Sequence, residues 1–150
     1  MARVFIDAAI MVFLLERLMS QVEGYVLRIA TKQWVSQVFS LAIYFTKLRR
    51  KWKKGQMILF MHRTSIGDAF VGYGVVEALR EIDELSQDDK ATCEQGGWKR
   101  AIEFTYVKQF EKPLAVRNTF LRDSKLRGRC FHGLKLSNDQ MRSIMVQAEA

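Results

Sequence analysis

Two stretches rich in apolar and β-branched residues dominate the middle of the chain. Residues 57–63 and 70–76 have the composition of strands, and the polar residues 64–68 between them are typical of a turn. Gly72 and Gly74 lie inside the second stretch, where glycine usually marks a bulge or a close approach of another group to the backbone. The pattern therefore predicts two consecutive strands joined by a turn that carries polar side chains.

Shorter segments with a clear period lie on either side of this pair. Residues 25–30 and 42–45 have the composition of strands, and apolar residues at helical spacing between them predict a helix that begins at Thr31. Apolar and polar residues alternate over residues 98–106, which predicts another strand, and Pro113 should end it. The middle of the chain is therefore expected to be mostly β, with one early helix.

The remaining segments complete the expected fold. Residues 4–22 have apolar side chains at helical spacing, whereas residues 86–97 are polar and end in glycine, so we expect a surface loop there. Ser137 and Gln140 have the spacing of a capping box, which predicts a C-terminal helix that packs on the sheet. Together the segments predict an α+β fold in one domain, residues 1–150. It would be a small curled β-barrel of five to six strands with flanking helices.

The distribution of charge points to the kind of partner. The chain has 24 basic and 16 acidic side chains, which gives a net charge of +8. Six of the cations lie within residues 47–54, and seven of the acids lie within residues 77–94, so we expect a basic face and an acidic one. A basic balance of this size favours nucleic acid or another anionic partner.

Other classes of protein fit the sequence less well. The apolar run of residues 8–15 is bounded by charges and is far short of the roughly 20 residues that span a bilayer, so we expect a cytoplasmic protein without membrane association. Cys93 and Cys130 are too far apart in sequence for a disulfide framework or a zinc module, and we expect no metal and no cofactor. The sequence lacks the common hydrolase, phosphate-loop and metallopeptidase motifs, which favours a binding module over an enzyme.

The order of several segments allows comparison with a known family. These segments are Ile29-Ala30-Thr31 with Trp34 soon after, Lys54-Gly55-Gln56, the strand that ends in His62-Arg63, Val71-Gly72-Tyr73-Gly74-Val75-Val76, the strand that begins at Trp98, and Leu134-Lys135-Leu136-Ser137. Their order resembles the PUA-like superfamily, and the EVE and ASCH groups within it. The resemblance covers residues 23–146 and leaves residues 1–22 as an N-terminal extension. It implies a curled barrel with a pocket between strands and neighbouring loops, in proteins that bind RNA or single modified bases in RNA or DNA.

A base-binding site is expected near the turn between the two central strands. Arg63 offers forked donors, His62 can donate or accept, and Asp68 can accept a hydrogen bond from an exocyclic amine. With Ser65 and Trp98, these residues form the candidate base-binding set that the resemblance favours. The alternative interpretation is structural, with His62 ending a strand and Asp68 belonging to a turn beside a glycine.

A second candidate set would hold the phosphate backbone. It contains Arg49, Arg50, Lys51, Trp52, Lys53, Lys54, Arg127 and Arg129. Each neutralised phosphate would contribute through release of counterions, and Trp52 is expected to be exposed for stacking because cations flank it on both sides. Arg127 and Arg129 belong to a second basic cluster, and we expect the two clusters to line one groove. A charge run can also be a solvated loop without a partner.

The sequence therefore predicts a nucleic-acid-binding module that prefers RNA to DNA and takes a base, modified or not, into a pocket. One alternative is a metal-independent ribonuclease of the ASCH type, in which His62, Asp68 and Lys54 would move protons. Another is a protein-interaction domain without nucleic acid, whose basic and acidic faces pair with a partner or with a second copy. No catalytic residue is assigned, and the oligomeric state stays open.

Overall fold

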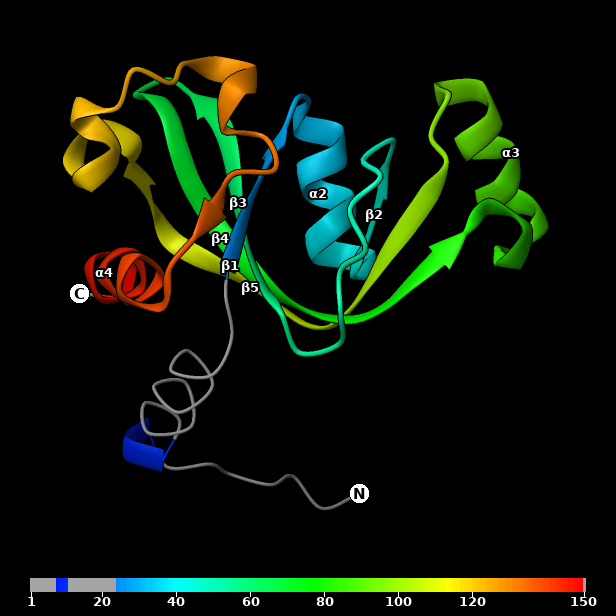
Figure 1. Cartoon of the computed structure of the whole chain (residues 1–150), viewed down its shortest axis with the longest axis horizontal. Coiled ribbons are helices and arrows are strands. Elements are labelled where there is room, and N and C mark those ends of the chain that lie inside the picture. Colours follow the sequence, from blue (N-terminus) through cyan, green and yellow to red (C-terminus); the bar gives the residue numbers. More distant parts are fainter. Residues whose placement is uncertain (1–7, 11–23, 150) are drawn as a thin grey trace.

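The computed structural model describes residues 8–10 and 24–149 (Figure 1). Residues 8–10 are helical, and the rest of the helix expected over residues 4–22 lies outside the described residues. The strands are β1 (Gly24–Ile29), β2 (Ile43–Thr46), β3 (Met57–Thr64), β4 (Gly67–Glu81), β5 (Arg100–Ala115) and β6 (Lys135–Leu136). The helices are α2 (Lys32–Leu41), α3 (Gln87–Gly96) and α4 (Asn138–Glu149), and the short 3-10 turns are η1 (Ile82–Glu84), η2 (Val116–Asn118), η3 (Phe120–Asp123) and η4 (Gly128–Phe131).

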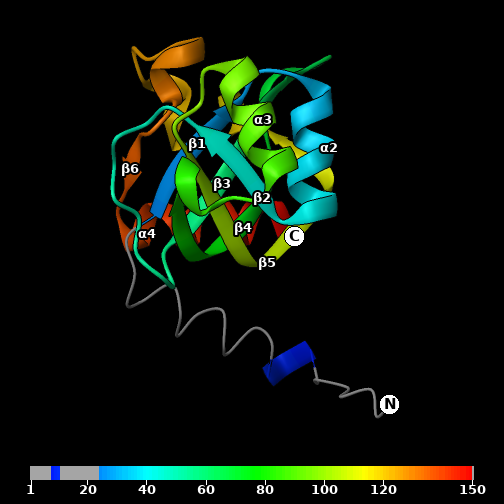
Figure 2. The ribbon, with the colours of Figure 1, turned by 90° about the vertical axis from the view of Figure 1, so that its right-hand side faces the viewer.

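The strands form one curled sheet in the order β2-β5-β4-β3-β1-β6. Among these strands, only β1 and β3 pair in parallel. Register shifts in the β3–β4 and β4–β5 pairs mark bulges, which increase the local twist and bend the strands. As a result, the two edges of the sheet approach each other, and the ring centroids of Tyr44 in β2 and His132 just before β6 lie 6.5 Å apart. We call this line of approach the seam (Figure 2).

The sheet is curled but not closed, which corrects the expected barrel to an open sheet. Within the described residues, no backbone pairing joins β2 to β1 or β6. The reason is that β2 has only four residues, all of which pair with β5. The α+β class, the number of strands and the C-terminal helix are as predicted.

The two faces of the sheet carry separate apolar clusters, because successive side chains on a strand point to opposite faces. Val26, Leu59 and Met61 pack on one face beneath α4 and the turns η2 to η4. Leu27 and Phe60 pack on the other face, where α2 lies. The site described below lies where these two layers meet at the edges of the sheet.

The helices α2 and α4 confirm the expectations drawn from the sequence. The Thr31 side chain caps α2 by accepting a hydrogen bond from the Trp34 amide. The Ser137 hydroxyl accepts from the Gln140 amide, and the Gln140 side chain accepts from the Ser137 amide, which completes the capping box of α4. None of the helices in the described part of the chain is long and apolar enough to cross a membrane.

Residues 86–97 form a helix, so the expected surface loop is wrong. The Ser86 hydroxyl caps α3 at its start, and Gly97 ends it with a φ of 73°. The capping serine and the terminal glycine are ordinary helix signals. However, Cys93 is the one buried residue of α3, so this helix has no stripe of apolar side chains. The prediction for this segment failed because it relied on hydrophobic periodicity.

Pro113 does not end its strand, which is a second correction. β5 begins at Arg100 and continues through Pro113 to Ala115. Because β2 pairs only with residues 100–103 of β5, the far half of β5 has β4 on one side only. Proline is tolerated on such a free edge, where its missing amide hydrogen breaks no ladder bond.

Gly72 confirms the interpretation that glycine in the second central strand permits a close approach. A Cβ atom at this position would lie 2.3 Å from the carbonyl oxygen of Lys108 and 2.5 Å from Phe39 Cζ. The β4–β5 register also shifts next to this glycine. The position therefore lets β5 and α2 pack against the backbone of β4.

Trp52 is buried, with an exposed fraction of 5%, so the expectation that it is exposed is wrong. It lies in residues 47–56, which we call the connector because they cross from β2 to β3 along the open side of the sheet (Figure 2). Leu48 and Trp52 pack into the same cluster as α2. The flanking cations are all exposed. Charged side chains stay in water while apolar ones are buried, so the connector turns its two apolar side chains towards the sheet and its cations towards solvent.

Replacement of Trp52 should destabilise the fold. We expect Trp52→Ala to lower the free energy of unfolding by about 3–5 kcal/mol, since it leaves a cavity under the connector. Trp52→Phe should cost less, because the indole Nε1 has no hydrogen-bond partner among the described residues. Urea titrations would measure both changes. Lys51→Ala and Lys53→Ala are the controls, each within about 0.5 kcal/mol of the parent, and a Trp52→Ala effect of that same size would contradict the anchoring role.

Candidate nucleic-acid interface

A pocket of about 290 Å³ lies on the seam, and we call it the seam pocket. Its walls come from β2, the connector, the segment before β5 and the end of turn η4. They are Tyr44, Thr46, Lys47, Leu48, Trp98 and His132. The Thr46 hydroxyl accepts a hydrogen bond from the Leu48 amide, which turns the start of the connector back across the pocket. Only the curl of the sheet brings these segments together.

Aromatic rings supply three of the six wall residues of the seam pocket. Trp98 packs edge-to-face on Trp34, with ring centroids 4.7 Å apart, and its ring centroid lies 6.0 Å from that of Phe45. Tyr44 and His132 face each other across the seam at a tilt of 58°. The rings are therefore held by the core behind them while the pocket stays open, as a stacking site requires.

His132 is held as a neutral ring. Its Nδ1 accepts a hydrogen bond of 3.0 Å from the Arg28 amide, so the proton of the neutral imidazole belongs on Nε2. Burial lowers the pKa of His132, and the positive charge of Arg28 lowers it further. Burial also raises the pKa of Tyr44 to about 12, so its phenol is protonated at neutral pH. The aromatic walls therefore carry no charge, and Lys47 is the cation at the rim.

Arg28 also extends to the opposite side of turn η4. Its Nε and Nη2 lie 3.2 and 3.1 Å from Oδ1 of Asp68, and the two side chains are only 16% and 20% exposed. Asp68 lines a second pocket of about 290 Å³, which we call the arginine pocket. One residue therefore supports a wall of the seam pocket through its backbone and a wall of the arginine pocket through its side chain.

The structure keeps Arg63, Ser65 and Asp68 together at the turn between β3 and β4, but it separates His62 and Trp98 from them. Arg63 and Asp68 are cross-strand neighbours, but His62 lies on the opposite face of the sheet, and its Nδ1 donates a 2.7 Å hydrogen bond to the Ile29 carbonyl. Ser65 is exposed in the turn between β3 and β4. Trp98 lies at the far end of the long β4–β5 pair, beside α3 (Figure 1). Their binding roles stay predictions, and only Trp98 lines the seam pocket.

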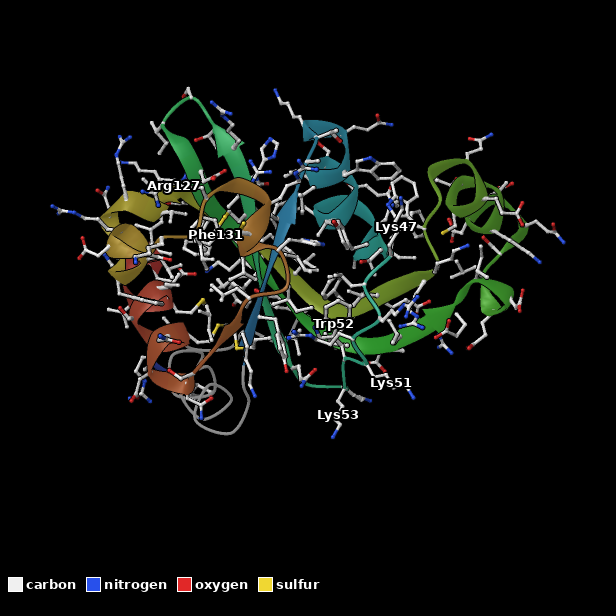
Figure 3. All side chains as sticks on the ribbon, turned by 45° about the horizontal axis from the view of Figure 1, so that its top comes forward. Lys47, Lys51, Trp52, Lys53, Arg127 and Phe131 are labelled. Atoms are coloured by element: carbon white, nitrogen blue, oxygen red, sulfur yellow. The ribbon has the colours of Figure 1, made fainter. Side chains whose placement is uncertain are left out.

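The connector presents its cations to solvent in two groups. Arg50 lies over the Tyr25 ring, with Cζ 4.3 Å from the ring centroid, and Lys54 pairs with Glu77 at 3.2 Å. Among the described residues, the side chains of Arg49, Lys51 and Lys53 have no ion-pair or hydrogen-bond partner. Figure 3 shows Lys51 and Lys53 extending outwards while Trp52 lies over the strands. The second group is therefore free to contact an anionic ligand.

Turn η4 separates the two pockets and carries the other predicted cations. Phe131 and Arg127 line the arginine pocket, whereas His132, the next residue, lines the seam pocket. Arg129 is exposed on the turn itself. In Figure 3, Arg127 and Phe131 lie on one side of β1 and Lys47 lies on the other. The two basic clusters thus flank adjacent pockets, and a shared binding groove stays a prediction.

The residues proposed for a ribonuclease are not brought together. Lys54 precedes β3 and His62 lies near its end, which separates them by most of an eight-residue strand. Lys54 is paired with Glu77, and Asp68 is paired with Arg28. No proton relay can be drawn among these three side chains as they are placed.

Sequence reasoning missed Tyr44, Arg28 and His132 as members of the site. Tyr44 belongs to a short strand with no local signal beyond its composition, and His132 is an isolated histidine in a basic segment. They meet only because the sheet curls and the 132–134 segment runs along the free edge of β1, where the Gly133 amide donates to the Val26 carbonyl. No spacing in the sequence encodes this contact.

Solved structures with this architecture support the resemblance found in the sequence. A variant of the ASCH protein from Zymomonas mobilis matches with a TM-score of 0.60, over 83% of this chain and 95% of that one, at 11% identity. The chain therefore shares the fold of this ASCH protein. A YTH domain of the Zygosaccharomyces rouxii MRB1 protein, in complex with N6-methyladenosine RNA, matches with a TM-score of 0.57, over 87% and 86% of the two chains, at 14% identity.

Another YTH domain, that of Pho92 in complex with N6-methyladenosine, matches with a TM-score of 0.54 over 86% of this chain and 84% of that one, at 12% identity. No protein-family model matches the sequence, and a search among curated proteins finds no significant match. At identities this low, the likeness establishes a shared fold and not the activity.

Acidification should destabilise the protein through His132. Because the pKa of His132 is lowered in the folded state, the unfolded chain binds more protons below the ordinary pKa of 6.5. The free energy of unfolding should therefore decrease as the pH falls below that value. His132→Gln keeps an acceptor for the Arg28 amide but cannot titrate, so its stability should depend less on pH. Urea titrations at about pH 7.5 and about pH 5.5 would measure the difference, and equal pH dependence in the two proteins would contradict the assignment.

Proposed function

We propose that this protein binds single-stranded RNA and takes one base, modified or not, into the seam pocket. The observation that carries the proposal is an uncharged aromatic pocket next to a row of free cations. Residues 23–146 form the binding core in this proposal, and residues 1–22 form an extension of the same domain. The proposed preference for RNA over DNA is supported by the YTH domains with this fold, which were solved with N6-methyladenosine or N6-methyladenosine RNA.

The chemistry of the seam pocket suits a flat, neutral ligand. A base stacked on an aromatic side chain contributes about 1–3 kcal/mol, and Tyr44, Trp98 and His132 present rings around one opening. The protonated phenol of Tyr44 and Nε2 of His132 can donate hydrogen bonds to acceptors on a base edge. These three rings carry no charge and Lys47 is the cation at the rim, which favours a nucleobase inside the pocket and a phosphate at its edge.

The connector suits the backbone of the same strand. Arg49, Lys51 and Lys53 are exposed and unpaired among the described residues, and Lys47 links them to the pocket because it is part of both. Contacts between these cations and phosphates would release counterions, so binding should weaken as salt increases. Base and backbone contacts can therefore be distinguished by their dependence on salt.

The backbone contacts can be tested with Arg49→Ala, Lys51→Ala and Lys53→Ala in one protein. We expect weaker binding to single-stranded RNA and a shallower slope of log affinity against log salt, by about 0.7 for each phosphate that the variant no longer neutralises. Fluorescence anisotropy at several salt concentrations would measure the slope. The matched control is Lys32→Ala, Lys112→Ala and Arg142→Ala, which removes the same charge from other exposed sites. An equal change in both triple variants would mean that only net charge matters.

The base contact should behave differently. Tyr44→Ala is expected to weaken RNA binding by about tenfold, which corresponds to about 1.4 kcal/mol, while the salt slope stays the same. Tyr106→Ala is the control, because Tyr106 is an exposed tyrosine outside the pocket. N6-methyladenosine RNA and the unmodified RNA of the same sequence are the first ligands to compare. Failure of the parent protein to bind either RNA, or DNA of matched length, at low salt would contradict the proposed function and favour an interaction domain.

A further inference from the structure

The arginine pocket has an apolar floor beneath a basic rim. Val116, Leu121 and Phe131 are buried core residues that form part of its floor. Its rim carries the exposed arginines Arg117, Arg122 and Arg127. A floor of this kind can receive a flat ring, and guanidinium groups bind phosphate through paired donors. The pocket therefore has both of the features that recognise a nucleotide.

Backbone carbonyls hold two of the three arginines in place. Nη1 of Arg117 donates to the Ile66 carbonyl at 3.0 Å. Nη1 of Arg127 donates to the carbonyls of Ser124 and Leu126, both at 2.8 Å. A guanidinium has five donors, so each of these groups keeps others for a ligand. Arg122 has no partner among the described residues, and its whole guanidinium is available.

The rim charge is not neutralised from within the pocket. Asp68 is the carboxylate in its lining, and that group is already paired with Arg28. The pocket therefore keeps a net positive charge. An anionic group would gain from entering it, whereas a neutral ligand would leave the three cations without a counter-charge.

The arginine pocket and the seam pocket are neighbours across one turn. Phe131 lines the first and His132 lines the second, and consecutive Cα atoms are about 3.8 Å apart. Arg28 supports a wall of each. A strand that has one base in the seam pocket and passes over turn η4 would bring its next nucleotide to the mouth of the arginine pocket.

Charge also decides the direction in which the strand leaves the seam pocket. The segment before Trp98 is α3, whose exposed acids include Asp88 and Glu94. Phosphates that extend towards this arm would be repelled. On the other side, turn η4 and the arginine pocket offer cations, so the part of the strand that the connector does not hold should run in that direction.

We propose that the arginine pocket is a second nucleotide subsite, in which the base next to the one in the seam pocket lies on the apolar floor and a phosphate lies between the arginines. This inference rests on the proposed RNA binding. The site would then recognise at least two consecutive nucleotides, and turn η4 would separate their bases.

Photo-crosslinking would test the subsite directly. The probes are RNA octamers of random sequence in which 4-thiouridine occupies one chosen position, crosslinked to the full chain and mapped by mass spectrometry. We expect crosslinked peptides from both pockets, one group around Tyr44, Trp98 and His132 and the other around Ile66, Leu126 and Phe131. Crosslinks in the first group alone would overturn the second subsite and leave the proposed function intact. The absence of binding would overturn both.

Arg122→Ala gives an independent test, because this side chain makes no contact that the fold needs. Affinity for the octamers should fall by about three- to tenfold, and the salt slope should become shallower by about 0.7. Crosslinks around Leu126 should also decrease while those around Trp98 persist. Arg142→Ala, an exposed arginine on α4, is the matched control. An Arg122→Ala protein that binds and crosslinks like this control would overturn the subsite.

Discussion

The packing of the connector across the open side of the sheet is the interaction on which the other features depend. A curled sheet that does not close leaves apolar side chains along its seam, and Leu48 and Trp52 pack in one apolar cluster with residues of β1 and α2. Burying these two residues forces the intervening cations outwards. The same packing therefore stabilises the sheet and keeps the cations of the connector exposed. A substitution that weakens the packing should also change where these cations lie.

Arg28 is the second residue on which the site depends, because it contacts a wall of each pocket. Its side chain pairs with Asp68 in a largely buried position, and its amide orients His132. Removing one member of such a pair leaves the other without its partner in a poorly solvated place, which costs more than the contact itself contributes. Both pockets thus share one polar support, so their walls are held in a fixed relation.

The low sequence identity to the solved structures that share this fold has a physical reason. The fold requires apolar side chains at alternating positions, bulges in the long strands and small residues such as Gly72 where elements approach closely. Many sequences satisfy these conditions. The pocket walls come from loops, strand ends and a short edge strand, so ligand chemistry can change while the sheet stays the same.

Local pattern was enough to determine β1, α2, β3, β4 and α4, because each buries one face and therefore shows a period or a cap in its own sequence. It was not enough for α3, which buries little besides Cys93, or for Pro113, whose tolerance depends on an absent neighbouring strand. The prediction that Trp52 is exposed was wrong because the cations around it lie on the solvent side of the connector, whereas Trp52 lies on the side that packs on the sheet. Of the seam pocket, the sequence analysis had named Trp98, and the tertiary structure decided which residues join it. Tyr44, Trp98 and His132 lie far apart in the chain, and the bending of the sheet, a sum of small twists and bulges, is what brings the three rings around one opening.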